Sequence, residues 1–212
     1  MTLVAYTEIK TDTKLDTLWA RVKYAFPSKE NEEYFREIEK RKNQNSIKES
    51  LCALLLLAAL LERANIPSRD LILDRHESGK PRFKNSKIEF SLSHSHGYAA
   101  AAISDSSRIG IDLETAKIPH EKAAKLAKRF FTEDEKQAIE ADPDSFLRLW
   151  TKKEAYTKML GTPLSELIAN EKKTPDPKRE NAFFYELSAD GHPMTVCLEK
   201  PCEIKSLGEI IV

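Results

Sequence analysis

The spacing of hydrophobic and polar positions along the chain predicts a mixture of helices and short strands. Apolar residues recur three and four apart, as on one face of a helix, over 15–26, 32–42, 47–65, 120–129 and 146–161. Alternating or short apolar runs predict strands at 3–9, 71–73, 88–92, 98–103, 109–114, 183–187 and 194–198. The chain shows no repeat of fixed length, so the pattern indicates an α+β fold class.

The predicted helix over 146–161 carries the first candidate chemistry. Trp150, Glu154 and Lys158 recur at a spacing of four and therefore share one face. Gly161 is suited to end the helix in a left-handed conformation. Taken alone, a carboxylate and an ammonium one turn apart are also explained by a salt bridge on a core helix, which contributes only about 0.2–0.5 kcal/mol.

The predicted strand over 109–114 carries a second candidate site. Its apolar residues alternate with Gly110, Asp112 and Glu114, so the two carboxylates project from one face. The glycine beside them is expected to leave room for a bulky ligand. Like charges so close together repel unless a cation lies between them, and oxygen ligands without His or Cys favour Mg²⁺. Two solvated acids on an edge strand are the alternative interpretation.

Together the two stretches resemble the signature of the 4′-phosphopantetheinyl transferases. A GxDxE pattern at Gly110–Glu114 is followed about forty residues later by a WxxKEAxxK pattern at Trp150–Lys158. The resemblance extends to Gly79–Pro81, Ser91–Ser95 and Ala127–Glu135. In length and order the chain resembles the larger monomeric branch of the family, the Sfp type, rather than the short trimeric branch.

This resemblance implies a particular division of the chain. The fold would consist of two similar α+β subdomains in a pseudo-two-fold arrangement, with coenzyme A bound between them. The polar segment 105–107 is the best boundary in the sequence. We therefore expect an N-terminal subdomain over 1–106 and a C-terminal subdomain over 107–212 that carries the metal-binding motifs, in a monomeric protein.

The activity that the resemblance implies moves the 4′-phosphopantetheine arm of coenzyme A onto a serine hydroxyl of an apo-carrier protein, releasing 3′,5′-ADP. Asp112, Glu114 and Glu154 match the family's ligands for Mg²⁺, with Mn²⁺ as the alternative ion. Glu154 also matches the residue proposed to deprotonate the serine, directly or through a metal-bound water. Lys158 matches the lysine that contacts the diphosphate. The expected catalytic set is Glu154, Lys158 and Asp112.

Further positions match the family's contacts to coenzyme A: Lys80, Pro81, Ser93, His94, Lys48, Arg36 and again Lys158. Lys80 and Pro81 fall in the GKP segment beside the adenine, and Ser93 and His94 match a phosphate-contacting pair. Lys48 and Arg36 align loosely with contacts to the 3′-phosphate, and exposed basic side chains without a ligand are the alternative for these two. Residues 93–97 are predicted to form a loop whose hydroxyls and imidazoles suit phosphate contact.

The predicted helix over 120–129 is a candidate docking surface for the partner protein. It sets Lys122, Lys125 and Arg129 at i, i+3 and i+7, as one basic stripe. Because the family's carrier proteins are typically acidic around the modified serine, the stripe suits docking of an acyl- or peptidyl-carrier protein. A solvated amphipathic helix is the alternative. The sequence leaves open whether the carrier serves fatty acid, polyketide or nonribosomal peptide synthesis.

Composition narrows the cellular setting. Lys plus Arg equals Asp plus Glu at 34 each, so no net charge favours nucleic acid or an anionic membrane. The three cysteines lack metal-binding spacing, which indicates a reducing compartment. We find no signal-peptide pattern, and the apolar run 51–61 is too short to span a bilayer, so we expect a cytoplasmic protein. A catalytically silent relative that binds coenzyme A or a carrier protein is the alternative function.

Overall fold

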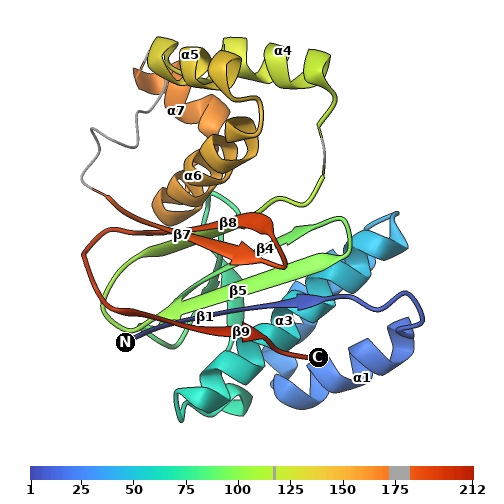
Figure 1. Ribbon diagram of the computed structural model, residues 1–212. Helices are drawn as coiled ribbons and strands as arrows, with labels where there is room; N and C mark the ends of the chain where they lie inside the picture. Colours follow the sequence, from blue (N-terminus) through green and yellow to red (C-terminus); the bar gives the residue numbers. More distant parts are fainter. Residues whose placement is uncertain (117, 172–181) are drawn as a thin grey trace.

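The computed structural model describes residues 1–116, 118–171 and 182–212 and arranges them in successive layers (Figure 1). Helices α1, α2 and α3 cover one side of a four-stranded sheet, and a three-stranded sheet packs on its other side. Helices α4 to α7 lie beyond the smaller sheet (Figure 1). Within the described residues the architecture is therefore mixed α+β, and the predicted fold class is confirmed.

The elements have the following bounds. The helices are α1 (Leu15–Ala25), α2 (Glu32–Glu39), α3 (Gln44–Arg63), α4 (His120–Phe130), α5 (Glu133–Ala141), α6 (Ser145–Leu160) and α7 (Leu164–Glu171). The larger sheet has the order β4 (Glu89–Ser95), β5 (Tyr98–Ser104), β1 (Thr2–Glu8) and β9 (Ile204–Glu209). The smaller sheet has the order β6 (Ile109–Leu113), β8 (His192–Leu198) and β7 (Phe183–Ala189). A separate pair consists of β2 (Leu73–Arg75) and β3 (Pro81–Phe83).

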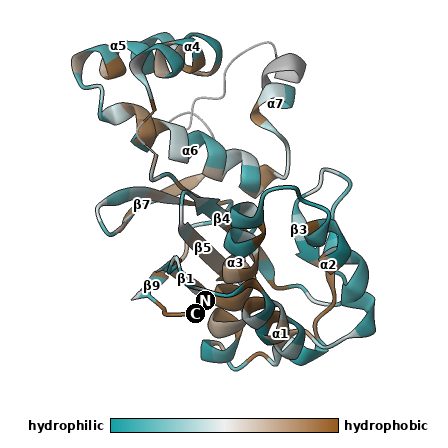
Figure 2. Ribbon diagram, turned by 90° about the vertical axis from the view of Figure 1, so that its right-hand side faces the viewer, coloured by the Kyte–Doolittle hydropathy of each residue, from teal (hydrophilic) through white to brown (hydrophobic). Residues whose placement is uncertain are grey.

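Helix α3 is the centre of the hydrophobic core between the helices α1 to α3 and the larger sheet. Asn43 caps its start by accepting hydrogen bonds from the amides of Asn45 and Ser46. The apolar run 51–61 belongs to this helix, which has 20 residues. The prediction that the segment is too short to span a bilayer was therefore wrong. By length and composition the helix could cross a membrane, yet 61% of its apolar window is buried in this fold, as in a core helix. Figure 2 shows the hydrophobic residues gathered on α3 and the neighbouring strands.

The two sheets pack through small and branched side chains that form a second core. The larger sheet contributes Val4, Ala100 and Ala102, and the smaller sheet contributes Ile109, Ile111, Leu113 and Val196, all buried. The apolar residues of β6 thus face the neighbouring sheet, as the alternation over 109–114 predicts. Its remaining residues therefore face away from that core, toward α6.

Gly110 lets α6 lie directly on β6. A Cβ atom built on Gly110 would stand 1.9 Å from the carbonyl oxygen of Ala155 and 2.4 Å from the amide nitrogen of Met159. Both are backbone atoms of α6, so no side chain can be accommodated there. The expectation that this glycine leaves room for a ligand is therefore wrong: the helix occupies that space.

The predicted loop over 93–97 is also wrong. Strand β4 continues to Ser95, which pairs with Tyr98 of β5. Only His96 and Gly97 form the turn, with φ of 42° and 87°. The two-residue hairpin turn of type I′ has positive φ at both positions, and glycine adopts it without strain. Ser93 and His94 consequently belong to a strand, with their side chains on opposite faces.

The C-terminal strand crosses the predicted subdomain boundary. β9 pairs in parallel with β1, so residues 204–209 complete the larger sheet although they follow the smaller one in sequence. Neither β9 nor α7 was predicted from the sequence. The division into 1–106 and 107–212 stays a prediction, with the segment 105–107 joining β5 to β6.

Gly110→Ala tests the contact between α6 and β6. We expect it to lower the free energy of unfolding by about 3 kcal/mol or more, the upper end of overpacking costs, because the colliding atoms are backbone. Gly191→Ala is the control, since Gly191 has a positive φ but open space around it. Its cost should be about 1–2 kcal/mol from the left-handed backbone alone. Urea denaturation measures both, and equal losses would contradict the clash.

Candidate active site

The contact between β6 and α6 brings together the predicted acidic residues. Strand β6 and the residue after it supply Asp112 and Glu114, and α6 supplies Glu154 and Lys158. Lys158 Nζ donates to Asp112 Oδ1 at 2.7 Å. The sequence suggested Glu154 as the lysine's partner, but the ion pair joins the helix to the strand instead. We call these four residues the carboxylate cluster.

Burial and mutual repulsion shape the electrostatics of this cluster. Asp112 is only 5% exposed, and Glu114 and Glu154 are partly buried. Burial, followed by repulsion from Asp112, raises the pKa of Glu154 above its ordinary value. The same two causes, in the same order, raise the pKa of Glu114. Lys158 opposes both shifts without cancelling them, so the cluster has an excess of negative charge that a cation would relieve.

The donor set fits a divalent cation with a preference for oxygen. Asp112 Oδ2 is buried and has no hydrogen-bond partner among the described residues, a costly state for a carboxylate oxygen. With Glu114 and Glu154 beside it, the available ligands are carboxylates, as Mg²⁺ prefers. No three described His, Cys, Asp or Glu residues already stand in ligand geometry, so binding requires side-chain adjustment. Convergence of the three acids on one ion stays a prediction.

Ser93 lies on β4 and contacts two members of the carboxylate cluster, and its predicted contact to a phosphate stays a prediction. Its side chain is buried, and its hydroxyl donates to Asp112 Oδ1 at 2.9 Å. It accepts from Lys158 Nζ at 2.9 Å and from the amide of Leu113 at 3.3 Å. A hydroxyl has one donor and two acceptor positions, and all three are used. The structure therefore gives Ser93 a part in the cluster that the sequence did not predict.

His94 points from the opposite face of β4 into a cleft of about 790 Å³. Lys48 and Glu114 also line this cleft, so it connects one predicted nucleotide contact on α3 to the carboxylate cluster. His94 Nδ1 lies 3.1 Å from Glu49 Oε2, and the Gly97 amide donates to Glu49 Oε1 at 3.0 Å. Burial, the largest single influence, would raise the pKa of Glu49, but these two hydrogen bonds together with electrostatic attraction to His94 and His96 hold the pKa below its ordinary value.

Glu49 is thus a site residue that the sequence reading missed. It holds the β4–β5 turn against α3 and orients the imidazole of His94. Nothing in its local spacing distinguishes Glu49 from any other acid at the start of a helix. Its partners lie more than forty positions away in the chain, at His94 and Gly97.

Lys80, Pro81 and Arg36 are not brought into this cleft. Lys80 is largely buried; its Nζ donates to the carbonyl oxygen of Ile109 at 3.0 Å, and burial lowers its pKa. Pro81 lies in β3, opposite Arg75. Arg36 is exposed on α2, where its Nε donates to the carbonyl oxygen of Glu32 in the same helix at 3.3 Å. Their predicted contacts to coenzyme A stay predictions.

Lys153, the lysine next to Glu154 in the motif, is buried. Its Nζ pairs with Glu135 Oε2 at 2.9 Å and lies over the ring of Phe131. Glu135 also completes a capping box with Thr132 at the start of α5. The pair therefore ties α5 to α6 one residue from Glu154, which the sequence did not indicate.

The basic stripe is exposed, as predicted for α4. Lys122, Lys125 and Arg129 are on the outer surface of the helix, while Ala127 and Phe130 are buried. Beside α4, a cleft of about 720 Å³ runs between α4, α5 and α6. It is lined mainly by Ile118, Ala123, Ala127, Ile139, Phe146 and Leu147, with Lys128 and Lys136. The acids Glu140 and Asp144 also line it, so an apolar cleft with charges of both signs at its border lies next to the stripe.

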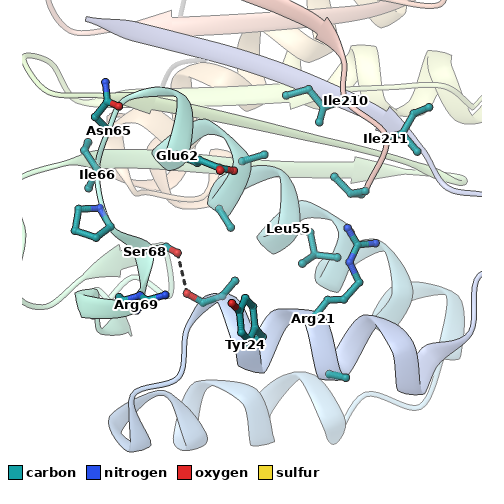
Figure 3. A pocket seen from close by; sticks show the side chains of 16 residues that line it. Arg21, Tyr24, Leu55, Glu62, Asn65, Ile66, Ser68, Arg69, Ile210 and Ile211 are labelled. Atoms are coloured by element: carbon teal, nitrogen blue, oxygen red, sulfur yellow. Dashed lines mark hydrogen bonds between the residues drawn. The ribbon is translucent and has the colours of Figure 1, made fainter.

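A further cleft of about 900 Å³ lies elsewhere, between α1, α3 and the C-terminal residues (Figure 3). Its lining includes Arg21, Tyr24, Leu55, Ile66 and Ile211. None of the predicted site residues lines it. The candidate chemistry therefore lies away from this cleft.

Comparison with known proteins supports the interpretation of this site. Residues 108–200 match the 4′-phosphopantetheinyl transferase superfamily. The chain is 36% identical over 113 residues to the 4′-phosphopantetheinyl transferase gsp of Aneurinibacillus migulanus, covering 51% of this chain and 46% of that protein. It is 40% identical over 103 residues to the 4′-phosphopantetheinyl transferase HetI of a Nostoc strain, covering 44% and 43%.

A third relative is the 4′-phosphopantetheinyl transferase psf-1 of Bacillus pumilus, 32% identical over 118 residues, which cover 53% of this chain and 49% of that protein. The matched part thus spans about half the length of each of these three relatives. The family match at 108–200 contains Asp112, Glu114, Glu154 and Lys158, the four residues of the carboxylate cluster. The resemblance seen in the sequence is confirmed.

The raised pKa values predict how stability responds to pH without metal. Between the unfolded and the folded pKa, the folded protein holds protons on Glu114 and Glu154 that the unfolded chain has released. The contribution of these two groups to the free energy of unfolding must therefore fall as pH rises from about 4.5 through their folded pKa values. Glu154→Gln removes one of these groups. We therefore expect the free energy of unfolding of this variant to fall less steeply with pH, and to be higher at neutral pH, than that of the wild type.

Urea denaturation in the presence of a chelator, at a series of pH values from about 4 to 8, measures this slope. Glu33→Gln is the control, since Glu33 is an exposed acid on α2. It should leave the wild-type slope unchanged. A Glu154→Gln protein less stable than the wild type at neutral pH would contradict the repulsion inferred for the cluster.

Proposed function

We propose, on the premise that residues 108–200 of this chain belong to the 4′-phosphopantetheinyl transferase superfamily, that the protein moves the phosphopantetheine arm of coenzyme A onto a carrier protein. The acceptor would be a serine hydroxyl of an apo acyl- or peptidyl-carrier protein, and 3′,5′-ADP would leave. The observation that carries the proposal is the carboxylate cluster, with its unpartnered Asp112 Oδ2, inside the matched residues. We further propose that the protein is a cytoplasmic monomer.

The chemistry is a phosphoryl transfer at the β-phosphorus of coenzyme A. The serine oxygen forms a bond to that phosphorus, and the bond between the phosphorus and the oxygen bridging to the α-phosphate breaks. The electron pair of the broken bond leaves with 3′,5′-ADP. In such reactions the protein mainly positions the reactants and stabilises charge, so the required groups are cations beside the diphosphate and a base beside the serine.

Glu154 is suited to act as that base. Burial, followed by repulsion from the neighbouring carboxylates, raises its pKa in the metal-free cluster. A bound ion would relieve the repulsion, but burial would still favour uptake of a proton by this carboxylate over an exposed one. It would accept the proton of the serine hydroxyl as the new bond forms. Lys158, whose side chain is 30% exposed beside Asp112, can donate to the diphosphate and stabilise charge on the departing nucleotide.

Asp112, Glu114 and Glu154 are the residues that would hold Mg²⁺. When bound, the ion would neutralise diphosphate charge. Asp112 Oδ1 already accepts from Ser93 and Lys158, so Oδ2 is the free ligand atom of that carboxylate. Relief of the repulsion that raises the pKa of Glu114 and Glu154 would strengthen binding.

The cleft that contains Lys48, His94 and Glu114 is the proposed position of the nucleotide end of coenzyme A. It opens next to the carboxylate cluster, so a ligand could extend from the imidazole of His94 to the acids. Lys48 supplies a positive charge suited to a phosphate. This placement assigns Lys48 and His94 to the 3′-phosphate end of the substrate.

Incubation with coenzyme A, Mg²⁺ and an apo-carrier tests the transfer. We expect the intact mass of the carrier to rise by one phosphopantetheine and 3′,5′-ADP to appear. Asp112→Ala should lower the rate by at least about 10²-fold, as loss of one preorganised electrostatic contact does. A chelator should abolish transfer, and activity that persists in its presence would contradict the metal assignment.

The same experiment separates the alternative function. A protein that binds coenzyme A in calorimetry but leaves the mass of several apo-carriers unchanged would be a binding relative without turnover. Mg²⁺ at about 100 times its dissociation constant should also stabilise the folded protein by about 2.7 kcal/mol in wild type and by less in Asp112→Ala. Thermal unfolding measures this independently of the carrier.

The basic stripe and the apolar cleft beside α4 are the proposed docking surface for the carrier protein. Reversing Lys122 and Lys125 to Glu should raise the KM for the carrier and weaken its dependence on ionic strength. The KM for coenzyme A should not change, because neither lysine lines the cleft that contains His94. Initial rates at low and high salt measure both constants.

Lys40→Glu combined with Lys42→Glu is the matched control, because both residues are exposed and the change in net charge is the same. That variant should keep the wild-type KM for the carrier. Equal carrier kinetics in the two double variants at low salt would remove α4 from the docking surface.

A further inference from the structure

Three serines of β4 form a ladder of hydrogen bonds to β6, which we call the serine ladder (Ser91, Ser93 and Ser95). Their hydroxyls accept from the amides of Ile111, Leu113 and Thr115 at 3.0, 3.3 and 3.2 Å. The spacing of two in both segments makes this possible, because alternate side chains of β4 face alternate amides of β6 and of the residues just after it. All three serines are buried, at 4–7% exposure.

Two members of the ladder also hold an acid. Ser93 donates to Asp112 Oδ1 and Ser95 donates to Glu114 Oε2, both at 2.9 Å. The third, Ser91, bonds the amide after Gly110, which has no side chain to accept a proton. The ladder therefore repeats one backbone contact three times and adds a carboxylate contact at the two acidic positions.

The hydrogen atoms of Ser93 and Ser95 are directed by these contacts. A hydroxyl that accepts from an amide, and in the case of Ser93 also from Lys158 Nζ, can use its single proton only on another acceptor. For Ser93 that acceptor is Asp112 Oδ1. Ser95 Oγ has two acceptors within reach, Glu114 Oε2 at 2.9 Å and His96 Nδ1 at 3.3 Å, and the carboxylate oxygen is the nearer of the two. In Asp112, Oδ1 is held in this way, while Oδ2 has no partner in the described part of the chain.

We propose that Ser93 and Ser95 are positioning residues that orient Asp112 and Glu114 for a divalent cation. The inference rests on the proposed function, since it concerns the same carboxylate cluster. By occupying one oxygen of each acid, the serines fix its rotamer and leave the other oxygen for the ion. Hydrogen-bond partners behind metal-binding carboxylates typically change metal affinity by about 10–100-fold when removed.

Ser91→Ala, Ser93→Ala and Ser95→Ala test the proposal with a control inside the ladder. Each loses one bond to the backbone of β6, but only the last two also lose a bond to a carboxylate. Mn²⁺ is titrated into each protein without coenzyme A or carrier, and binding is measured by calorimetry and by the electron paramagnetic resonance signal of free Mn²⁺. Thermal unfolding of each metal-free variant reports the structural part of the loss.

We expect the dissociation constant for Mn²⁺ to rise at least about tenfold in Ser93→Ala and Ser95→Ala, and by less than about twofold in Ser91→Ala. If one variant does not fold, the other is compared with Ser91→Ala by itself. Dissociation constants that change equally in all three variants would overturn the proposal, as would a wild-type protein that does not bind Mn²⁺.

Failure of this inference differs from failure of the proposed function. A wild-type protein that modifies a carrier, with serine variants that bind Mn²⁺ normally, overturns the positioning role alone. The opposite outcome is that the dissociation constants for Mn²⁺ of the wild type and the serine variants follow the expected order, yet the wild type modifies no carrier. That result supports the positioning role and contradicts the transferase activity.

Discussion

The approach of α6 onto β6 at Gly110 is the constraint on which the rest of the site depends. Because a Cβ atom there would collide with the backbone of Ala155 and Met159, only glycine permits the helix to lie so close to the strand. This contact brings Glu154 and Lys158 of the helix to the side of β6 that carries Asp112 and Glu114. The acids that repel one another are therefore held together by packing.

The repulsion within the cluster is offset by contacts from both sides. The ion pair between Lys158 and Asp112 comes from α6, and the serine ladder comes from β4 on the other sheet. The ladder also joins the two sheets through side chains, since β4 and β6 do not pair through their backbones. The site thus lies where the two sheets and α6 meet, with the cleft that contains His94 opening beside it.

The structure separates two lysines that one motif places near each other. Lys153 is buried against Glu135 and Phe131 and fixes α5 on α6, whereas Lys158 is partly exposed beside the acids. A buried ion pair contributes less to stability than its distance suggests, because both charges lose hydration, but breaking it exposes an unpaired charge to the core. Lys153 is therefore a structural residue next to Glu154, and Lys158 is the lysine available to a substrate.

The sequence by itself determined the local parts of this site: the helix over 146–161, the strand that projects Asp112 and Glu114 from one face, and the resemblance that joins them. These follow from periodicities of 3.6 and 2, which neighbouring residues alone encode. Only the tertiary structure decided that α6 fills the space at Gly110, that Ser93 holds Asp112, that Glu49 holds His94, and that β9 completes the first sheet. Each of these depends on contacts between segments far apart in the chain, and local spacing carries no information about them.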